Sequence, residues 1–218
     1  MSTTLRFPRG LYGITPEWDD TARLLEAVRA AHAGGMQALQ WRRKKAAQNT
    51  TLHQTQRQAI VNLCSELNLP LIINDDWQLA LDLHTAGAHL GRDDGALAEA
   101  RAGLRPTQWL GSSCYNQPTL AEQALKIGVS YVAFGTAYVS SIKPDAPRAT
   151  LDIYRQGRKL CEQYATDSRA SLVAIGGITA ENAAPLIEAG VDSIAVISSL
   201  FEADNVYAEA QAFSRLFL

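Results

Sequence analysis

The sequence contains few cysteines and no long apolar run. Its three cysteines are Cys64, Cys114 and Cys161, which are widely spaced and form no CxxC pair. We interpret them as inert packing thiols of a protein in a reducing cytoplasm. No stretch approaches the roughly 20 apolar residues that a membrane span requires. The first residues, MSTTLRFPRG, carry no apolar signal core, so we expect the protein not to be exported.

The sequence also lacks an excess of charge of either sign. Lys and Arg number 20 against 22 Asp and Glu, which leaves a net charge of −2, and the pI is near 6.1. This balance argues against binding to nucleic acid or to a membrane surface, and small molecules are the expected partners. The 218 residues, 47% of them hydrophobic, can bury the core of one domain, predicted over residues 1–218. Whether the chain forms a homo-oligomer stays open.

Short apolar runs and amphipathic segments alternate along the chain. The apolar runs predict eight strands, over residues 10–14, 36–41, 71–73, 87–91, 108–111, 131–134, 172–175 and 193–196. The other segments predict eight helices, over residues 19–33, 51–67, 77–84, 96–102, 118–127, 151–164, 180–189 and from about 199. This alternation favours an α/β fold with a parallel sheet, and eight such units close into a single (β/α)8 TIM barrel. An open doubly wound sheet is the alternative, but it usually has fewer strands.

Acidic residues follow the third and fourth predicted strands. Asn74, Asp75 and Asp76 come directly after the apolar run 71–73, and Asp93 and Asp94 follow the next strand. Because the carboxyl ends of parallel strands meet in one crevice, these carboxylates would repel one another unless a cation lay between them. Such oxygen ligands suit Mg²⁺, which completes its shell with water and a phosphate substrate. The alternative is that Asp75 and Asp93 only cap helices, but the occurrence of both clusters at one level favours the metal.

Basic residues follow the second predicted strand. Gln40, Arg42 and Lys44 stand at alternating positions, so in an extended segment their side chains face one side. A pair of basic side chains at a strand end suits a diphosphate. Arg43 and Lys45 face the other side, where we expect them to be solvated.

Hydroxyl and glycine residues follow the remaining strands. Ser113 comes at the end of the fifth strand, and the loop 135–147 after the sixth holds Ser140, Ser141 and Lys143. Lys143 has two readings, a solvated lysine or one that reaches a phosphate from the barrel mouth.

The seventh and eighth strands end in small residues. Gly176 and Gly177 lead directly into a predicted helix, and Ser198 and Ser199 open the next one. Backbone N–H groups at helix N-termini bind phosphate, and barrels commonly build a phosphate site after these two strands. With the diphosphate group on the other side of the mouth, two anionic substrates face one another. The residues therefore indicate a transferase that expels pyrophosphate.

The motifs at these strand ends resemble those of the thiamine-phosphate synthase family. The similar segments are QWRRK at 40–44, IINDD at 72–76, HLGRDD at 89–94, GSS at 111–113, GTAYVSSIKPDAP at 135–147 and VAIGGITAENAAPLIEAGVDSIAVIS at 173–198. The resemblance spans nearly the whole chain. It implies a (β/α)8 barrel that joins 4-amino-5-hydroxymethyl-2-methylpyrimidine diphosphate to a thiazole phosphate, which yields thiamine phosphate and pyrophosphate.

The resemblance also implies roles for individual residues. The pyrimidine-diphosphate site falls on Gln40, Arg42, Lys44, Asn74, Ser113 and Lys143. The Mg²⁺ ligands fall on Asp75 and Asp94, and the thiazole-phosphate site on Ser140, Ser141, Ile142, Gly177, Ile197 and Ser198. Arg42, Lys44 and Lys143 would act in catalysis by stabilising the charge of departing pyrophosphate in a dissociative reaction. No protein nucleophile is required, and His89 is expected to be a packed histidine.

The sequence departs from the family pattern at three positions. Ile142 stands where a threonine is typical, Arg92 where glutamine is usual, and Thr136 where a proline is usual. Two alternatives follow. Thiazole tautomerases resemble this barrel, but their catalytic histidine follows the fifth strand, where this chain has Tyr115. A barrel that binds phosphate ligands without catalysis is the other alternative.

Overall fold

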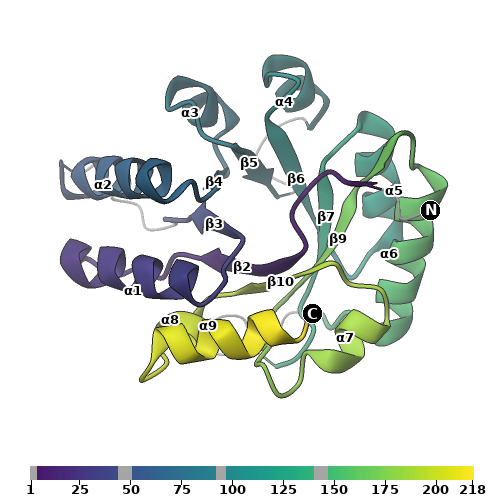
Figure 1. Ribbon diagram of the computed structural model, residues 1–218. Coiled ribbons are helices and arrows are strands. Elements are labelled where there is room, and N and C mark those ends of the chain that lie inside the picture. Colours follow the sequence, from purple (N-terminus) through teal and green to yellow (C-terminus); the bar gives the residue numbers. More distant parts are fainter. Residues whose placement is uncertain (1–3, 44–50, 92–96, 140–146) are drawn as a thin grey trace.

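A closed barrel of eight parallel strands forms the centre of the molecule, and helices surround it (Figure 1). The computed structural model describes residues 4–43, 51–91, 97–139 and 147–218. The barrel strands are β2 (Gly10–Ile14), β3 (Ala38–Trp41), β4 (Leu71–Asn74), β5 (Gly87–Leu90), β6 (Trp109–Tyr115), β7 (Tyr131–Phe134), β9 (Ser171–Ile175) and β10 (Ser193–Val196). Closure is made by β10, because its Ser193 pairs with both Gly10 of β2 and Val173 of β9. The predicted TIM barrel is confirmed.

The outer helices alternate with these strands along the chain. They are α1 (Thr21–Ala33), α2 (Thr51–Leu67), α3 (Trp77–Asp82), α4 (Leu97–Gly103), α5 (Pro118–Ile127), α6 (Leu151–Gln163), α7 (Ala184–Glu188), α8 (Ser198–Phe201) and α9 (Val206–Arg215). Local capping explains several of their bounds. The side chain of Asp20 accepts from Arg23 N at the start of α1, and Gly128 ends α5 in the left-handed conformation.

The core has two layers. The larger layer packs the outward-facing apolar residues of the strands against the helices. The smaller layer lies in the barrel interior and contains Phe7, Tyr12, Ile72, Tyr131 and Val173 among others. Phe7, just before β2, packs its ring 4.3 Å from the ring of Tyr131 and 5.3 Å from that of Trp109. Side chains therefore fill the amino end of the barrel, as in other barrels of eight strands.

The structure differs from the sequence prediction at the two ends of the chain, outside the barrel. Strand β1 (Thr4–Leu5) pairs with β8 (Ser168–Arg169) in a small separate sheet, which is too short to leave an apolar run. The predicted last helix is divided into α8 and α9, and Asn205 caps α9 by accepting from Ala208 N. A new cap inside a predicted helix begins a second helix there.

Candidate active site

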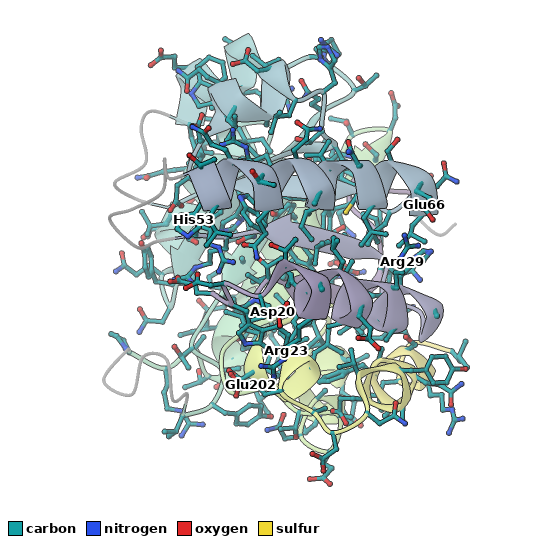
Figure 2. All side chains as sticks on the ribbon, turned by 90° about the vertical axis from the view of Figure 1, so that its left-hand side faces the viewer. Asp20, Arg23, Arg29, His53, Glu66 and Glu202 are labelled. Atoms are coloured by element: carbon teal, nitrogen blue, oxygen red, sulfur yellow. The ribbon has the colours of Figure 1, made fainter. Side chains whose placement is uncertain are left out.

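The residues predicted to carry the chemistry lie at the carboxyl ends of the barrel strands, where α1 and α2 begin. Figure 2 shows this end of the molecule on its left, with Asp20 and His53 labelled, and Arg29 and Glu66 at the opposite end. Lys44, Asp94, Ser140, Ser141, Ile142 and Lys143 fall outside the described residues, so their roles stay predictions.

Gln40 and Arg42 lie at the end of β3. Gln40 is buried, and its Nε2 donates to the hydroxyl of Tyr12 at 2.8 Å. Arg42 follows the strand, and its guanidinium forms an ion pair with Glu17 Oε1 at 3.1 Å. Its backbone N–H donates to Thr15 Oγ1 at 2.9 Å, which ties the end of β3 to the end of β2. Neither Thr15 nor Glu17 stood out in the sequence, because the segment after β2 carries no family motif.

Arg43 corrects the sequence prediction. It was expected in solvent, but the residue is only 7% exposed. Its guanidinium donates to the carbonyl of Pro16 at 3.0 Å and also to the carbonyl of Trp18 and to Gln56 Oε1. These acceptors come from the loop after β2 and from α2, which the alternation along β3 could not place. Arg43 therefore holds two segments of the carboxyl mouth together.

Asn74 and Asp75 lie at the end of β4. Asp75 has a φ of 65°, in the left-handed region, and its N–H donates to the carbonyl of His89 at 2.8 Å. The cap of α3 is Asp76, whose side chain accepts from Leu79 N at 2.8 Å. The suggestion that Asp75 only caps this helix is therefore wrong, because Asp76 fills that role. The counterpart suggestion for Asp93 falls outside the described residues.

Asn74 carries a buried donor without an internal partner. Among the residues that the structure describes, no acceptor lies within hydrogen-bond distance of its Nδ2. Asn74 and Asp75 line a hollow of about 300 Å³ whose other walls are the end of β3 and the first turns of α2 and α3. An unsatisfied buried donor costs free energy, so its persistence beside a hollow suits a group that binds a ligand.

Ser113 lies on β6, near its carboxyl end. Its hydroxyl is 2.8 Å from Nε2 of His89, which belongs to β5. His89 is only 8% exposed, and its ring stacks on that of Tyr131 with centroids 5.5 Å apart. The prediction of a packed histidine is confirmed. Tyr115, at the end of β6, occupies the position where tautomerases would carry a histidine.

The predicted phosphate segments after β7 and β9 lie against one another. Tyr138 N donates to the carbonyl of Gly176 at 2.9 Å. Gly177 has a φ of 64°, and a Cβ there would lie 2.4 Å from the carbonyl oxygen of Val139. Glycine is therefore required by both the backbone conformation and the neighbouring loop.

The helix after Gly177 begins later than predicted. Asn182 Oδ1 accepts from Thr179 N, and its Nδ2 donates to the carbonyl of Gly177, so these local bonds replace the first helical turn. Helix α7 starts only at Ala184. At the end of β10, Ile197 is the N-cap residue of α8, and Ser198 is the first residue of that helix. Of the predicted phosphate cradle, only the β10 side places residues directly at a helix start.

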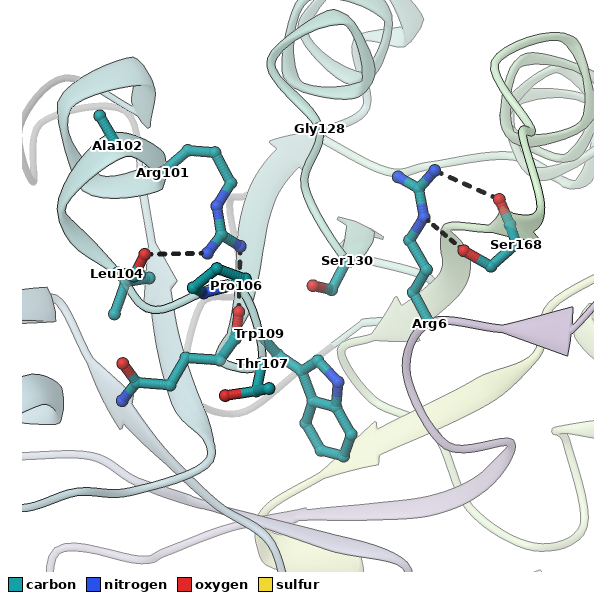
Figure 3. Close-up of a pocket in the computed structure, with 11 residues that line it drawn as sticks. Arg6, Arg101, Ala102, Leu104, Pro106, Thr107, Trp109, Gly128, Ser130 and Ser168 are labelled. Atoms are coloured by element: carbon teal, nitrogen blue, oxygen red, sulfur yellow. Dashed lines mark hydrogen bonds between the residues drawn. The ribbon is translucent and has the colours of Figure 1, made fainter.

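A second hollow lies at the opposite, amino end of the barrel. It measures about 780 Å³ and is lined by Arg6, Arg101, Trp109 and Ser130 among others (Figure 3). Arg101 donates to the carbonyls of Gln108 and Arg105 at 3.0 and 2.8 Å. Its partners are thus carbonyls of the segment that follows α4, and none of the predicted site residues that the structure describes lines this hollow.

The donors at this mouth can be compared with the needs of the expected Mg²⁺ ion. Within the described ranges, no three His, Cys, Asp or Glu side chains gather as a metal-binding group. Mg²⁺ does not require one, because it binds through one or two carboxylates and completes its octahedron with water and substrate phosphate. Asp75, with its carboxylate not used as a helix cap, fits this pattern beside the amide of Asn74.

Known proteins resemble this chain along almost its entire length. The family model described as thiamine monophosphate synthase matches residues 11–200. A thiamine-phosphate synthase of Bordetella pertussis is 50% identical over 214 residues, which cover 98% of this chain and 97% of the relative. One from Methylobacillus flagellatus is 47% identical, with 96% and 95% covered. A solved thiamine phosphate pyrophosphorylase from Pyrococcus furiosus has a TM-score of 0.78 and 29% identity, with 97% and 96% covered. In the described residues no helix is long and apolar enough to cross a membrane.

Proposed function

The chain belongs to the thiamine-phosphate synthase family. We propose the role that each of its site residues has in the reaction. The protein is a transferase that joins 4-amino-5-hydroxymethyl-2-methylpyrimidine diphosphate to 4-methyl-5-(2-phosphooxyethyl)thiazole. The products are thiamine phosphate and pyrophosphate. The observation that carries the assignment of the site is the gathering of Gln40, Arg42, Asn74, Asp75 and Ser113 at one mouth of the barrel.

The pyrimidine diphosphate binds on the β3–β6 side of this mouth. Gln40 and Ser113 reach it from inside the barrel, Asn74 supplies the buried N–H donor, and Arg42 supplies positive charge. Lys44 and Lys143, which lie outside the described residues, add the two further cations that the family resemblance assigns to this site. Three cations stabilise a leaving pyrophosphate better than they stabilise the bound substrate, because its negative charge grows as the bond breaks.

Mg²⁺ is the proposed cofactor, held by Asp75 and Asp94. When bound, it supplies positive charge that offsets the charge of the diphosphate. Asp75 is suited to hold it because it lies at the carboxyl end of β4 beside the buried amide of Asn74, and the cap of α3 is Asp76. Asp94 enters through the family resemblance.

The thiazole phosphate binds on the β7–β10 side. Gly177 lets the loop after β9 lie against the carbonyls of Tyr138 and Val139, and Ile197 and Ser198 begin α8 beside it. Ser140, Ser141 and Ile142 continue from the same loop after β7. Two anionic substrates then face one another across the mouth, and the thiazole nitrogen captures the pyrimidine methylene as pyrophosphate departs. The reaction takes place in the cytoplasm, in agreement with the three buried free thiols.

A pyrophosphate-release assay tests this proposal. We expect release only when both substrates and Mg²⁺ are present, with equal formation of thiamine phosphate. A protein that binds both ligands but releases no pyrophosphate would be a phosphate-binding barrel and would contradict the proposal. Turnover at the wild-type rate in excess chelator would contradict the metal alone.

A further inference from the structure

Five polar side chains form a continuous series of hydrogen bonds across the inside of the barrel. Gln40 Nε2 donates to the hydroxyl of Tyr12 at 2.8 Å, and this hydroxyl lies 2.9 Å from that of Tyr131. The Tyr131 hydroxyl lies 3.0 Å from Nδ1 of His89, whose Nε2 lies 2.8 Å from Ser113 Oγ. The members come from β3, β2, β7, β5 and β6 in that order. Both ends of this interior network, Gln40 and Ser113, belong to the proposed pyrimidine-diphosphate site.

The interior network is shielded from solvent along its middle. Tyr131 is 0% exposed and Tyr12 is 2% exposed. Burial raises the pKa of both hydroxyls, so each keeps its proton and needs an acceptor for it. Buried polar groups are almost always hydrogen-bonded, and polar networks in such surroundings specify one arrangement. The direction in which the protons point is therefore a structural property of this barrel.

The bond from Gln40 sets that direction. An amide nitrogen can only donate, so the hydroxyl oxygen of Tyr12 accepts this bond. The hydroxyl of Tyr12 must then donate its own hydrogen bond to the oxygen of Tyr131. Tyr131 then donates to Nδ1 of His89, and the neutral imidazole carries its proton on Nε2. That N–H donates to Ser113. If Tyr131 instead donated to Tyr12, the Tyr12 proton would have no acceptor among the described residues, which is unfavourable in the interior.

We propose that this interior network is a directional device, with His89 as its positioning residue, that presents a hydrogen-bond acceptor at Gln40 and a donor at Ser113 to the pyrimidine diphosphate. Gln40 uses its nitrogen internally, so Oε1 faces the ligand. Ser113 accepts internally from His89, so its own proton points to the ligand. The proposal deepens the proposed function, on which it rests.

These two ends match the chemistry of an aminopyrimidine diphosphate. An exocyclic amine is a donor and pairs with Gln40 Oε1, whereas ring nitrogens and phosphate oxygens are acceptors and pair with the Ser113 hydroxyl. The reverse direction would place the Gln40 NH₂ group against the amine, donor against donor. The network therefore selects for an amine and against a carbonyl at the same position of the ring. Such selection by a buried hydrogen bond is strong, because the wrong ligand leaves a polar group unpaired.

The first test measures the tautomer of His89 in the substrate-free protein. The chain has four histidines, and the ¹⁵N signals of His89 are identified by their loss in His89→Gln. We expect a neutral ring with its proton on Nε2. A proton on Nδ1, alone or together with one on Nε2, would overturn the proposed direction. This measurement requires no catalysis, so its outcome is independent of whether the two substrates react.

The second test compares two buried tyrosines. Tyr131→Phe keeps the ring but breaks the network at its centre. Tyr154→Phe is the matched control, because Tyr154 is 0% exposed and its hydroxyl donates to the carbonyl of Phe134 at 3.1 Å, outside this network. We expect Tyr131→Phe to raise the KM for the pyrimidine diphosphate about tenfold and to leave that for thiazole phosphate within about twofold, as for loss of one oriented hydrogen bond.

The control decides between positioning and simple stability. Tyr154→Phe should lower stability to a similar extent and leave both KM values unchanged. If the two variants have the same KM values while the wild type is active, the positioning role is wrong and the proposed function stands. If Tyr131→Phe does not fold, Tyr12→Phe interrupts the same network one residue earlier and is judged by the same criterion.

Discussion

The two ends of the barrel use their polar side chains in different ways. At the amino end, Asp192 forms paired bonds with Arg169, both at 2.8 Å, and also accepts from Leu172 N. At the carboxyl end, Asn74 Nδ2 has no acceptor among the described residues. The larger hollow, about 780 Å³, nevertheless lies at the amino end. The larger hollow and the predicted site residues therefore lie at opposite ends, so the size of a hollow does not by itself locate the predicted site.

The sharpest contrast comes from two neighbouring aspartates at the carboxyl end. Asp75→Asn should lower turnover on the order of 10³-fold, because it removes a negative ligand that contributes several kcal/mol of charge stabilisation through Mg²⁺. Asparagine tolerates the left-handed backbone of this position, so stability should be retained. Asp76→Asn is the control, since asparagine is an equally good cap of α3. Equal turnover in the two variants would remove Asp75 from the metal site.

A substitution at the amino end should lower stability and leave the kinetic constants unchanged. Asp192→Ala leaves the buried guanidinium of Arg169 without its carboxylate and should cost about 3–5 kcal/mol of unfolding free energy. The KM values of the folded fraction should not change, because Asp192 lies at the far end of the barrel from the site. Denaturant unfolding and kinetics on the same samples check both statements. A selective change in KM would show that the two ends are coupled.

Two adjacent arginines at the carboxyl end should have different effects when substituted, Arg42 on kcat/KM and Arg43 on stability. Arg42→Ala should lower kcat/KM by about 2–4 kcal/mol of transition-state stabilisation, with little loss of stability. The diphosphate can compete with Glu17 for Arg42, because both side chains of this ion pair are partly exposed, at 17% and 23%.

Arg43→Ala serves as its counterpart. The sequence alone would make this change nearly silent, but the structure predicts a loss of about 2 kcal/mol or more of stability, since Arg43 donates to two carbonyls and to Gln56 from a buried position. Wild-type stability of Arg43→Ala would show that the loops after β2 and β3 hold without it.

The three buried cysteine thiols should be unreactive in the folded protein. Burial raises the pKa of Cys64, Cys114 and Cys161 to about 12. The folded thiols then stay neutral while those of the unfolded chain ionise near 8.5, so stability should fall as the pH rises from about 8.5 to 12 and be unaffected by the thiols at lower pH. A thiol reagent at pH 8 should label none of them until the protein is denatured. Rapid labelling of the native protein would contradict this.

Much of the barrel could be predicted because its strands are short apolar runs with a period that local sequence reveals. The bounds of α2 and α5 agree with the prediction residue for residue. The small sheet of β1 and β8 could not be predicted, because each strand has only two residues and the pairing joins distant parts of the chain.

The sequence predicted which candidate residues follow the barrel strands, but not the contacts that these residues make. Alternation along β3 predicted different surroundings for Arg42 and Arg43, but not the carbonyls and the Gln56 side chain that surround Arg43. Acidic residues after β4 indicated a cluster, yet only the backbone shows that Asp76, and not Asp75, caps α3. Tyr12 and Tyr131 look like ordinary core residues in the sequence, because their hydroxyls find partners only when the barrel closes.

The left-handed backbone of Asp75 has a consequence for variation at this position. In a library randomised at residue 75, an active variant would have to meet two independent requirements, tolerance of the backbone conformation and a negative charge. Glycine and asparagine satisfy the backbone, with its φ of 65°, but lack the charge. Glutamate carries the charge but lacks the short side chain that tolerates this conformation. If the proposed role in binding Mg²⁺ holds, aspartate alone meets both demands, and position 75 is constrained by its backbone conformation as well as by the metal.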